Sequence, residues 1–255
     1  MKKKLKTSFI ILGLIIVFLL LSQVPIGAQN VPIPKLSIGV EPAKNPQDIA
    51  FSIQLLIILT ILALVPTILV MMTPFTRIVI VLSFMRQALG TQQAPPNQVL
   101  LGIALFMTLF IMSPTLKQIN DDALQPFLAK KIDQKQAFDR SIKPLRKFMF
   151  KQTKEAELSL YINLAKLKQP KNTDDVPTHV LIPAFITSEL KTAFIIGFIV
   201  YLPFLVIDMV IASTLMSMGM FMLPPTIISL PFKLVLFVLV DGWNLLSQGL
   251  IKSFL

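Results

Sequence analysis

The residues of this chain with the greatest chemical potential are charged side chains that interrupt long apolar blocks. They are Glu189, Lys191, Asp208, Lys233 and Asp241. A charge at the centre of a membrane helix costs about 2.5–3.5 kcal/mol on insertion scales, so each one needs a partner or a water-filled surface. We hypothesise that Glu189 and Lys233 form an ion pair between helices or between subunits. The alternative is that Glu189 and Lys191 lie at the membrane interface and that Lys233 extends its ammonium to water.

A second unusual feature is a methionine-rich stretch directly before two consecutive prolines. Its members, Met216, Met218, Met220 and Met222, alternate with other residues, and a helix would scatter this period of two around its circumference. We therefore predict a bend or loop whose flexible apolar side chains seal a hole and deform around what passes through it. Ordinary lipid contact or core filling is the alternative.

The sequence contains no residue pattern for catalysis or cofactor binding. It has no cysteine, which excludes thiol catalysis and Cys-ligated metal. His179 is the only histidine, so a multi-histidine metal site is excluded, and Asp174 and Asp175 suit a solvated loop. A glycine-rich phosphate loop is also missing. We expect no metal, no cofactor and no enzymatic activity.

Composition indicates that a bilayer is the solvent for much of the chain. Of the 255 residues, 54% are hydrophobic and 15% are charged, against about half and a quarter in an average soluble domain. The apolar residues occur in blocks of about 15–25, which are long enough to cross a hydrocarbon core as helices. The net charge of +11 is not arranged as a basic stripe with interleaved aromatics, so we expect no nucleic-acid binding.

Residues 1–28 show the pattern of a signal peptide. A basic start precedes an apolar run from Phe9 to Leu21, which small and turn-forming residues follow. We predict cleavage after Ala28, with an uncleaved amino-terminal anchor as the alternative. The proline-rich residues 29–50 are expected to form an extended tether.

The first pair of apolar segments lies in residues 51–114. Its members are Ile53–Met72 and Val99–Met112, and the second is expected to end at a Ser-Pro pair. The stretch between them carries Arg77 and Arg86 but no acid, so the positive-inside rule predicts a cytoplasmic-side loop. A packed hairpin, formed by the amphipathic part of this stretch and the second segment, is the alternative.

Residues 115–182 form a polar region of different composition. Between Thr115 and Val180 there are 13 Lys or Arg residues and 8 acids, which predicts a folded extracytoplasmic domain, because the orientation rule loses force for long loops. Apolar residues recur at helical spacing behind Ser141 and behind Thr153. Small amphipathic helices are therefore expected.

The second apolar pair lies in residues 183–255 and comprises Thr192–Ala212 and Thr226–Val240. Isolated strands cannot satisfy their backbone groups in lipid, and no alternating pattern of a membrane barrel is visible. We therefore predict an all-α membrane protein, built from helical hairpins of apolar segments and a small helical extracytoplasmic domain.

Two long stretches resemble the signature segments of the FliP family of type III secretion proteins. They are PAFITSELKTAFIIGF, from Pro183 to Phe198, and PFKLVLFVLVDGW, from Pro231 to Trp243. The order of elements agrees over residues 50–255, including the stretch TPFTRIVIVLSFMRQALGTQQAPPNQVL. The resemblance implies a core subunit of an export gate, which forms the entrance of the channel for unfolded flagellar proteins. It also implies a homopentamer that assembles with FliQ-like and FliR-like subunits.

Particular residues acquire roles through this resemblance. The family's methionine-rich gasket corresponds to Met220, Phe221 and Met222, where the phenylalanine departs from an all-methionine seal, and its inter-subunit charged pair corresponds to Glu189 and Lys233. The implied location is the bacterial inner membrane and the flagellar basal body, with the polar domain on the periplasmic side and the apolar hairpins packed largely on one another. A small-solute secondary transporter with an intramembrane acid as coupling site is the rival interpretation.

Overall fold

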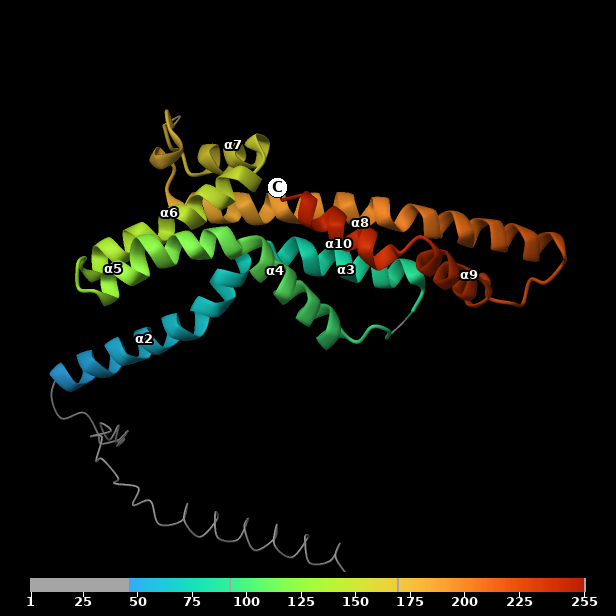
Figure 1. Ribbon diagram of the computed structural model, residues 1–255, viewed down its shortest axis with the longest axis horizontal. Helices are drawn as coiled ribbons and strands as arrows, with labels where there is room; N and C mark the ends of the chain where they lie inside the picture. The colour runs from blue at the N-terminus through green and yellow to red at the C-terminus, as the bar shows by residue number, and fades with distance from the viewer. Residues whose placement is uncertain (1–45, 92, 169, 255) are drawn as a thin grey trace, which may run out of the picture. The chain divides into compact units, whose positions relative to one another are not determined.

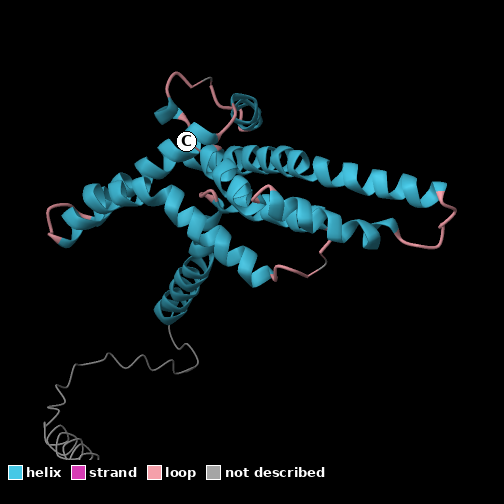
Figure 2. Cartoon of the chain, turned by 45° about the vertical axis from the view of Figure 1, so that its right-hand side comes forward, coloured by secondary structure: helices cyan, strands magenta, loops and turns pink. Residues whose placement is uncertain are grey.

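The computed structural model of the chain describes residues 46–91, 93–168 and 170–254. The predicted signal peptide and most of the predicted tether lie outside these residues. The first described helix begins at Pro46, so the end of that tether is helical. All regular elements of the described residues are helices and none is a strand (Figure 2), which confirms the prediction of an all-α protein.

The chain divides into two units, Met1–Ile53 and Gln54–Leu255. Helix α2 (Pro46–Met71) crosses this division, and every later described element belongs to the second unit. These later elements are α3 (Phe75–Leu89), α4 (Asn97–Ile119), the π-helical turn η1 (Asn120–Leu124), α5 (Gln125–Leu128), α6 (Gln134–Gln152), α7 (Glu155–Leu164), the 3₁₀ turn η2 (Thr173–Asp175), α8 (Thr178–Ser217), α9 (Pro225–Leu239) and α10 (Gly242–Lys252).

Helix α8 organises the second unit, because α3, α6, α7 and α9 all pack against it. Figure 1 shows α3 running along α8. Helix α3 buries Ile78, Val81 and Met85 completely, and this spacing of three and four residues places them on one face. They join Ala193 of α8 in the larger of two apolar cores.

A second core lies under the polar region, between α6, α7 and the first turns of α8. Its centre holds Met149 and Phe185, both completely buried. Helix α6 begins at Gln134, earlier than the predicted start behind Ser141. The reason is a capping box at Asp133, whose carboxylate accepts from the Gln136 backbone N–H at 2.7 Å and satisfies a free amide of the first turn.

Two predicted segment ends are wrong, because helices continue through them. Helix α4 passes the predicted end at Pro114 and runs on to Ile119. Helix α8 is continuous from Thr178 to Ser217 and contains Pro183 and Pro203, so the predicted division between residues 182 and 183 falls inside it. Proline removes one hydrogen bond from such a helix, and contacts with neighbouring helices offset this loss.

By length and composition, two helical stretches of the described residues are able to cross a membrane, Asn97–Leu128 and Thr178–Ser217. Helices α9 and α10 together form a third stretch of this kind, bent by 65°. Residues 75–89 are not a loop but the helix α3, which packs against α4. The structure therefore matches the packed-hairpin alternative, and Arg77, at 2% exposure, does not act as a loop charge.

Candidate functional site

The most deeply buried ion pair of the described residues joins α3 and α8. Arg77 is 2% exposed and Glu189 is 0% exposed. The Arg77 Nε donates to Glu189 Oε2 at 2.9 Å, and Nη2 of the same guanidinium donates to Oε1. Because a bidentate pair of this kind satisfies both charges geometrically, the loss of either partner would leave the other charge buried without compensation.

The guanidinium of Arg77 also holds α6 and the residues that follow α10. Its Nη1 donates to the backbone oxygen and to the hydroxyl of Ser253, each at 3.0 Å. Its Nη2 donates to Gln152 Oε1 at 3.2 Å. The guanidinium carbon lies 3.8 Å from the centroid of the Phe254 ring, a favourable cation–π arrangement. One side chain therefore joins three helices and the carboxy-terminal segment.

A second ion pair links α8 to α9. The Lys233 Nζ lies 2.6 Å from Asp208 Oδ2, and the Ser229 hydroxyl donates to Asp208 Oδ1 at 2.5 Å. The side chain of Lys233 is 4% exposed and that of Asp208 is 24% exposed. A Cβ atom at Gly90 would stand 3.9 Å from the Lys233 ammonium, so this cation also lies at the carboxyl end of α3, where the helix dipole favours positive charge.

Glu189 and Lys233 therefore have different partners within one chain. Both oxygens of Glu189 accept from Arg77, and Lys233 pairs with Asp208. Both side chains are buried among the helices of their own chain. The alternative that places Glu189 at the membrane interface and the Lys233 ammonium in water is therefore wrong for these two residues. A bridge between Glu189 of one subunit and Lys233 of another stays a prediction, and the two intrachain pairs compete with it.

A third ion pair fixes α7 to α8 outside the most apolar part of the chain. The Lys191 Nζ donates to Glu157 Oε1 at 2.8 Å. The side chain of Glu157 is 7% exposed and that of Lys191 is 56% exposed. The hydrogen bond from Lys191 is the largest cause that lowers the pKa of the Glu157 carboxyl below its ordinary value, although partial desolvation opposes it. Glu157 therefore stays ionised in the folded chain at neutral pH.

Met218, Met220 and Met222 lie in the connection between α8 and α9, which confirms the predicted loop for these three residues. Met216 is still part of helix α8, so the loop begins later than predicted. Gly219 takes the left-handed conformation, with φ 74°, directly after Met218, the C-cap residue of α8. The proposed gasket side chains that follow are open to solvent: Met220 is 44%, Phe221 79% and Met222 97% exposed. Their exposure leaves them free to contact other molecules, while the sealing function itself stays a prediction.

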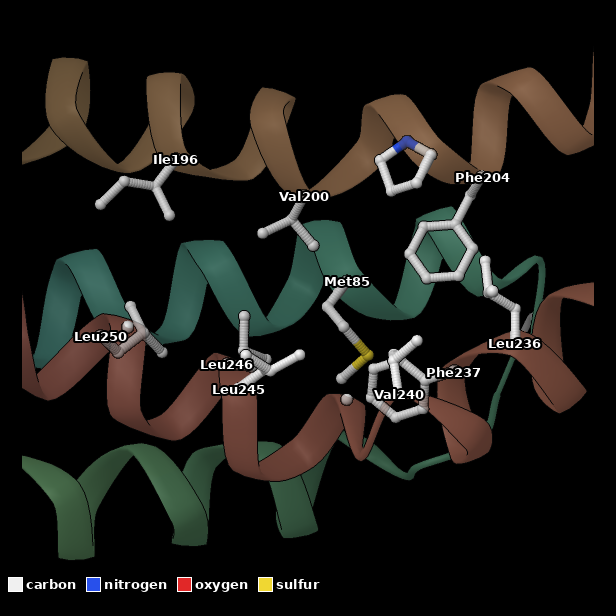
Figure 3. A pocket seen from close by; sticks show the side chains of 13 residues that line it. Met85, Ile196, Val200, Phe204, Leu236, Phe237, Val240, Leu245, Leu246 and Leu250 are labelled. Carbon is white, nitrogen blue, oxygen red and sulfur yellow. The ribbon is translucent and has the colours of Figure 1, made fainter.

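An apolar cavity of about 480 Å³ lies between α3, α8, α9 and α10 (Figure 3). Its walls include Met85, Val200, Phe204, Phe237 and Leu246. No ionisable side chain lines it, so it offers neither a general acid nor a general base. Within residues 54–254 as described, no group of three or more His, Asp or Glu residues is placed to hold a metal ion. The polar chemistry of the site is ion pairing.

The importance of Arg77 was not apparent from the sequence. Its partner Glu189 lies 112 residues away, and no short motif connects them. The available signal was periodicity, because Arg77, Val81 and Met85 are spaced by four residues and share the buried face of α3. An arginine on an apolar helical face requires a partner carboxylate.

These features define an all-α membrane protein in which Glu189, Asp208 and Lys233 are ion-paired between helices and whose longest helix, α8, ends at an exposed apolar loop. The FliP family model matches residues 58–250. The chain therefore belongs to the FliP family.

Relatives named "Flagellar biosynthetic protein FliP" are similar over most of their length. The protein of Bacillus subtilis strain 168 is 52% identical over 217 residues, which cover 85% of this chain and 98% of the relative. The protein of Pectobacterium carotovorum is 55% identical over 208 residues, or 82% of this chain and 81% of the relative. That of Borreliella burgdorferi is 53% identical over 211 residues, or 82% and 83%.

Proposed function

We propose that this chain is a core subunit of the flagellar type III export gate, and that it forms the entrance of the channel through which unfolded flagellar proteins leave the cell. The observation that carries the proposal is the family match over residues 58–250, together with relatives of about half-identical sequence that are named flagellar biosynthetic proteins. The comparisons give no support to a small-solute transporter.

The exposed apolar surface of the second half of α8 agrees with this role. Val206, Met209 and Val210 are between 57% and 63% exposed, and the proposed gasket follows directly at the end of the helix. Such a surface needs lipid or other subunits to cover it. In the proposed gate, copies of the chain surround a passage, and the methionine-rich loops meet at its axis.

The full proposal includes partners and location. Five copies of the chain assemble with FliQ-like and FliR-like subunits in the bacterial inner membrane and the flagellar basal body, and the polar region at residues 115–182 faces the periplasm. The assembly conducts passively, without enzymatic activity of its own, and a partner ATPase or the proton gradient supplies the energy.

Complementation tests the function as a whole. Cells that lack the gene should be non-motile and should retain flagellar proteins in the cytoplasm, and the full-length chain should restore both. Gentle detergent extraction should yield a large ring, whose mass is measured by native mass spectrometry. Normal flagellar secretion in the deleted cells, or a chain that stays monomeric in every extract, would refute the proposal.

The sealing role of the gasket is tested by measuring leakage through the closed assembly. Replacing Met220, Phe221 and Met222 together by glycine should let small dyes or ions pass through the closed assembly, because glycine leaves an open hole where flexible side chains had closed it. The control replaces Met216 and Met218, which lie before the proposed seal, by glycine. Unchanged dye permeability of the triple variant, with normal assembly, contradicts the sealing role.

Charge reversal separates the proposed inter-subunit pair from the observed intrachain pair. Glu189→Lys should block ring assembly whether the partner of Glu189 is Lys233 or Arg77, because the new lysine lies next to another cation in both cases. If Lys233→Glu in the same chain restores the ring, Glu189 acts across the subunit interface. Rescue by Arg77→Glu, but not by Lys233→Glu, would show that Glu189 serves only its own protomer and would remove the inter-subunit bridge from the proposal.

A further inference from the structure

Helix α6 has a basic face, to which the proposed export function gives no role. Lys143 and Lys147 are both exposed, and their spacing of four residues places them on one face of the helix. Neither lysine belongs to any of the three ion pairs found among the described residues. Their charge is therefore not taken up by these three ion pairs.

These lysines lie beside the end of an apolar helical run. Helix α6 packs against α4, whose mainly apolar stretch ends at Met112 and is followed by a mixed turn in which Ser113, Lys117 and Gln118 accompany Leu116 and Ile119. Before this change, Phe106 and Phe110 of α4 are 73% and 67% exposed. A helix with such a change of composition crosses from hydrocarbon to headgroups there. Such a crossing of α4 would place the α6 lysines at headgroup depth.

Two hollows meet at Lys147. One, of about 260 Å³, is walled by Ile111 and Pro114 of α4 and by Phe148, with Lys147 at its polar side. The other, of about 340 Å³, is lined by Lys143 and Lys147 and, on the side of η2, by the acid Asp174. Around Lys147, apolar side chains lie next to more basic than acidic residues, and this combination matches a molecule with one hydrocarbon part and one anionic part.

Arg146 borders the second hollow but is already engaged. Its guanidinium donates to the Thr178 hydroxyl at 2.6 Å and to the backbone oxygens of Thr173 and Val176 at 3.0 and 2.7 Å. These bonds tie η2 to α6 and to the start of α8, so Arg146 shapes the hollow. The two lysines remain as the groups that provide binding charge.

We propose that Lys143 and Lys147 form a binding site for an anionic phospholipid. The ammonium groups bind the headgroup phosphate, and one acyl chain lies along the apolar wall made by Ile111 and Pro114. Charge complementarity selects anionic over zwitterionic headgroups, since each lysine adjacent to an anionic membrane surface adds to the attraction. The site anchors the polar region to the membrane surface next to α4 and does not depend on export activity.

The test uses the purified full-length chain in detergent, with phosphatidylglycerol or phosphatidylcholine of identical acyl chains added. Native mass spectrometry measures how much of each lipid the protein retains. We expect phosphatidylglycerol to be retained preferentially. Lys143→Gln together with Lys147→Gln should weaken its binding on the order of tenfold and leave phosphatidylcholine unchanged. Added salt should weaken retention by the wild type more than by the variant.

The matched control is Lys168→Gln with Lys171→Gln, which removes the same charge from two exposed lysines in the connection between α7 and η2. This variant should retain phosphatidylglycerol as the wild type does. Equal losses in both double variants would reduce the effect to net charge and overturn the site. Displacement of the lipid by glycerol 3-phosphate at equal concentration would show that the lysines take a free phosphate and would overturn the lipid assignment. Equal retention of both lipids would leave an acidic protein partner as the ligand and would also overturn it.

Discussion

The two halves of α8 are both rich in apolar residues but have different surroundings. In the first half, Leu181, Ala184, Phe185 and Ala193 are all completely buried against other helices of the chain. In the second half, large side chains such as Met209 remain more than half exposed. Hydrophobicity alone therefore does not reveal whether a segment finds its partners within the chain. The first half packs on α3, α6 and α7. The second half packs on α9 along one face, where Phe204 is buried, and leaves its other side chains for lipid or for other subunits.

The charged residues of α8 follow the same division. Glu189, in the packed half, is completely buried and bound at both oxygens by Arg77. Asp208, in the exposed half, keeps 24% of its side chain accessible while it binds Lys233. Because a buried charge without a partner costs more than a partly hydrated one, the two pairs should differ in their effect on folding.

The largest expected effect is therefore at Glu189. Glu189→Leu should lower the free energy of unfolding by about 3–5 kcal/mol, because it leaves the Arg77 guanidinium buried without its carboxylate. Lys233→Met should cost less, about 1.5–3 kcal/mol, since Asp208 keeps the Ser229 hydroxyl and some water. Denaturant unfolding in detergent, followed by circular dichroism, measures both. Equal losses, or a larger loss for Lys233→Met, would contradict the difference between the two pairs.

Replacing single glycines by alanine probes directly how tightly each helix is packed. A Cβ atom at Gly197 of α8 would lie 2.7 Å from the ring of Phe84, whereas one at Gly102 of α4 would meet no atom within 4 Å. Gly197→Ala should therefore destabilise the chain by about 1–3 kcal/mol through overpacking. Gly102→Ala should stabilise it by up to about 1 kcal/mol through helix propensity. The two thermal midpoints should move in opposite directions, and a shift of the same sign for both would refute the packing argument.

A smaller effect, which depends on pH, is expected where α7 meets the packed half of α8. The folded chain lowers the pKa of Glu157 through its hydrogen bond from Lys191. Its contribution to stability is therefore complete above the ordinary carboxyl pKa of about 4.3 and is lost as the pH falls through the lower folded pKa. Glu157→Gln should be less stable than the wild type at pH 7, and this difference should shrink as the pH falls below about 4. A constant difference between thermal midpoints from pH 7 to pH 3 would contradict this linkage.

The smallest effect on the isolated chain is expected in the exposed loop after α8. Phe221→Ala should change the free energy of unfolding of the monomer by less than about 0.5 kcal/mol, because 79% of this side chain is exposed. The same substitution should have a clear effect on dye leakage through the assembled ring. A large loss of monomer stability would mean that Phe221 packs within its own chain and is not left for contacts with other molecules.

Local sequence patterns were sufficient to predict much of the fold. The apolar blocks predicted helices, the apolar spacing behind Thr153 predicted α7, and the alternating methionines predicted the connection that follows Ser217. These predictions succeed because helix periodicity and turn preferences depend on residues that are close in sequence. Two predicted helix limits, the start behind Ser141 and the end at Pro114, were wrong. A capping box set an earlier start for α6, and contacts with neighbouring helices let α4 continue past the proline.

The sequence by itself determined that the chain is helical and apolar, that its intramembrane charges need partners, and that two signature stretches of the FliP family are present. Only the tertiary structure decided which charges meet. Arg77 and Glu189 are separated by 112 residues, and they come together because the apolar faces of α3 and α8 pack against each other. Ion pairing between distant residues follows from helix packing, and packing depends on how whole faces fit, which no local pattern encodes.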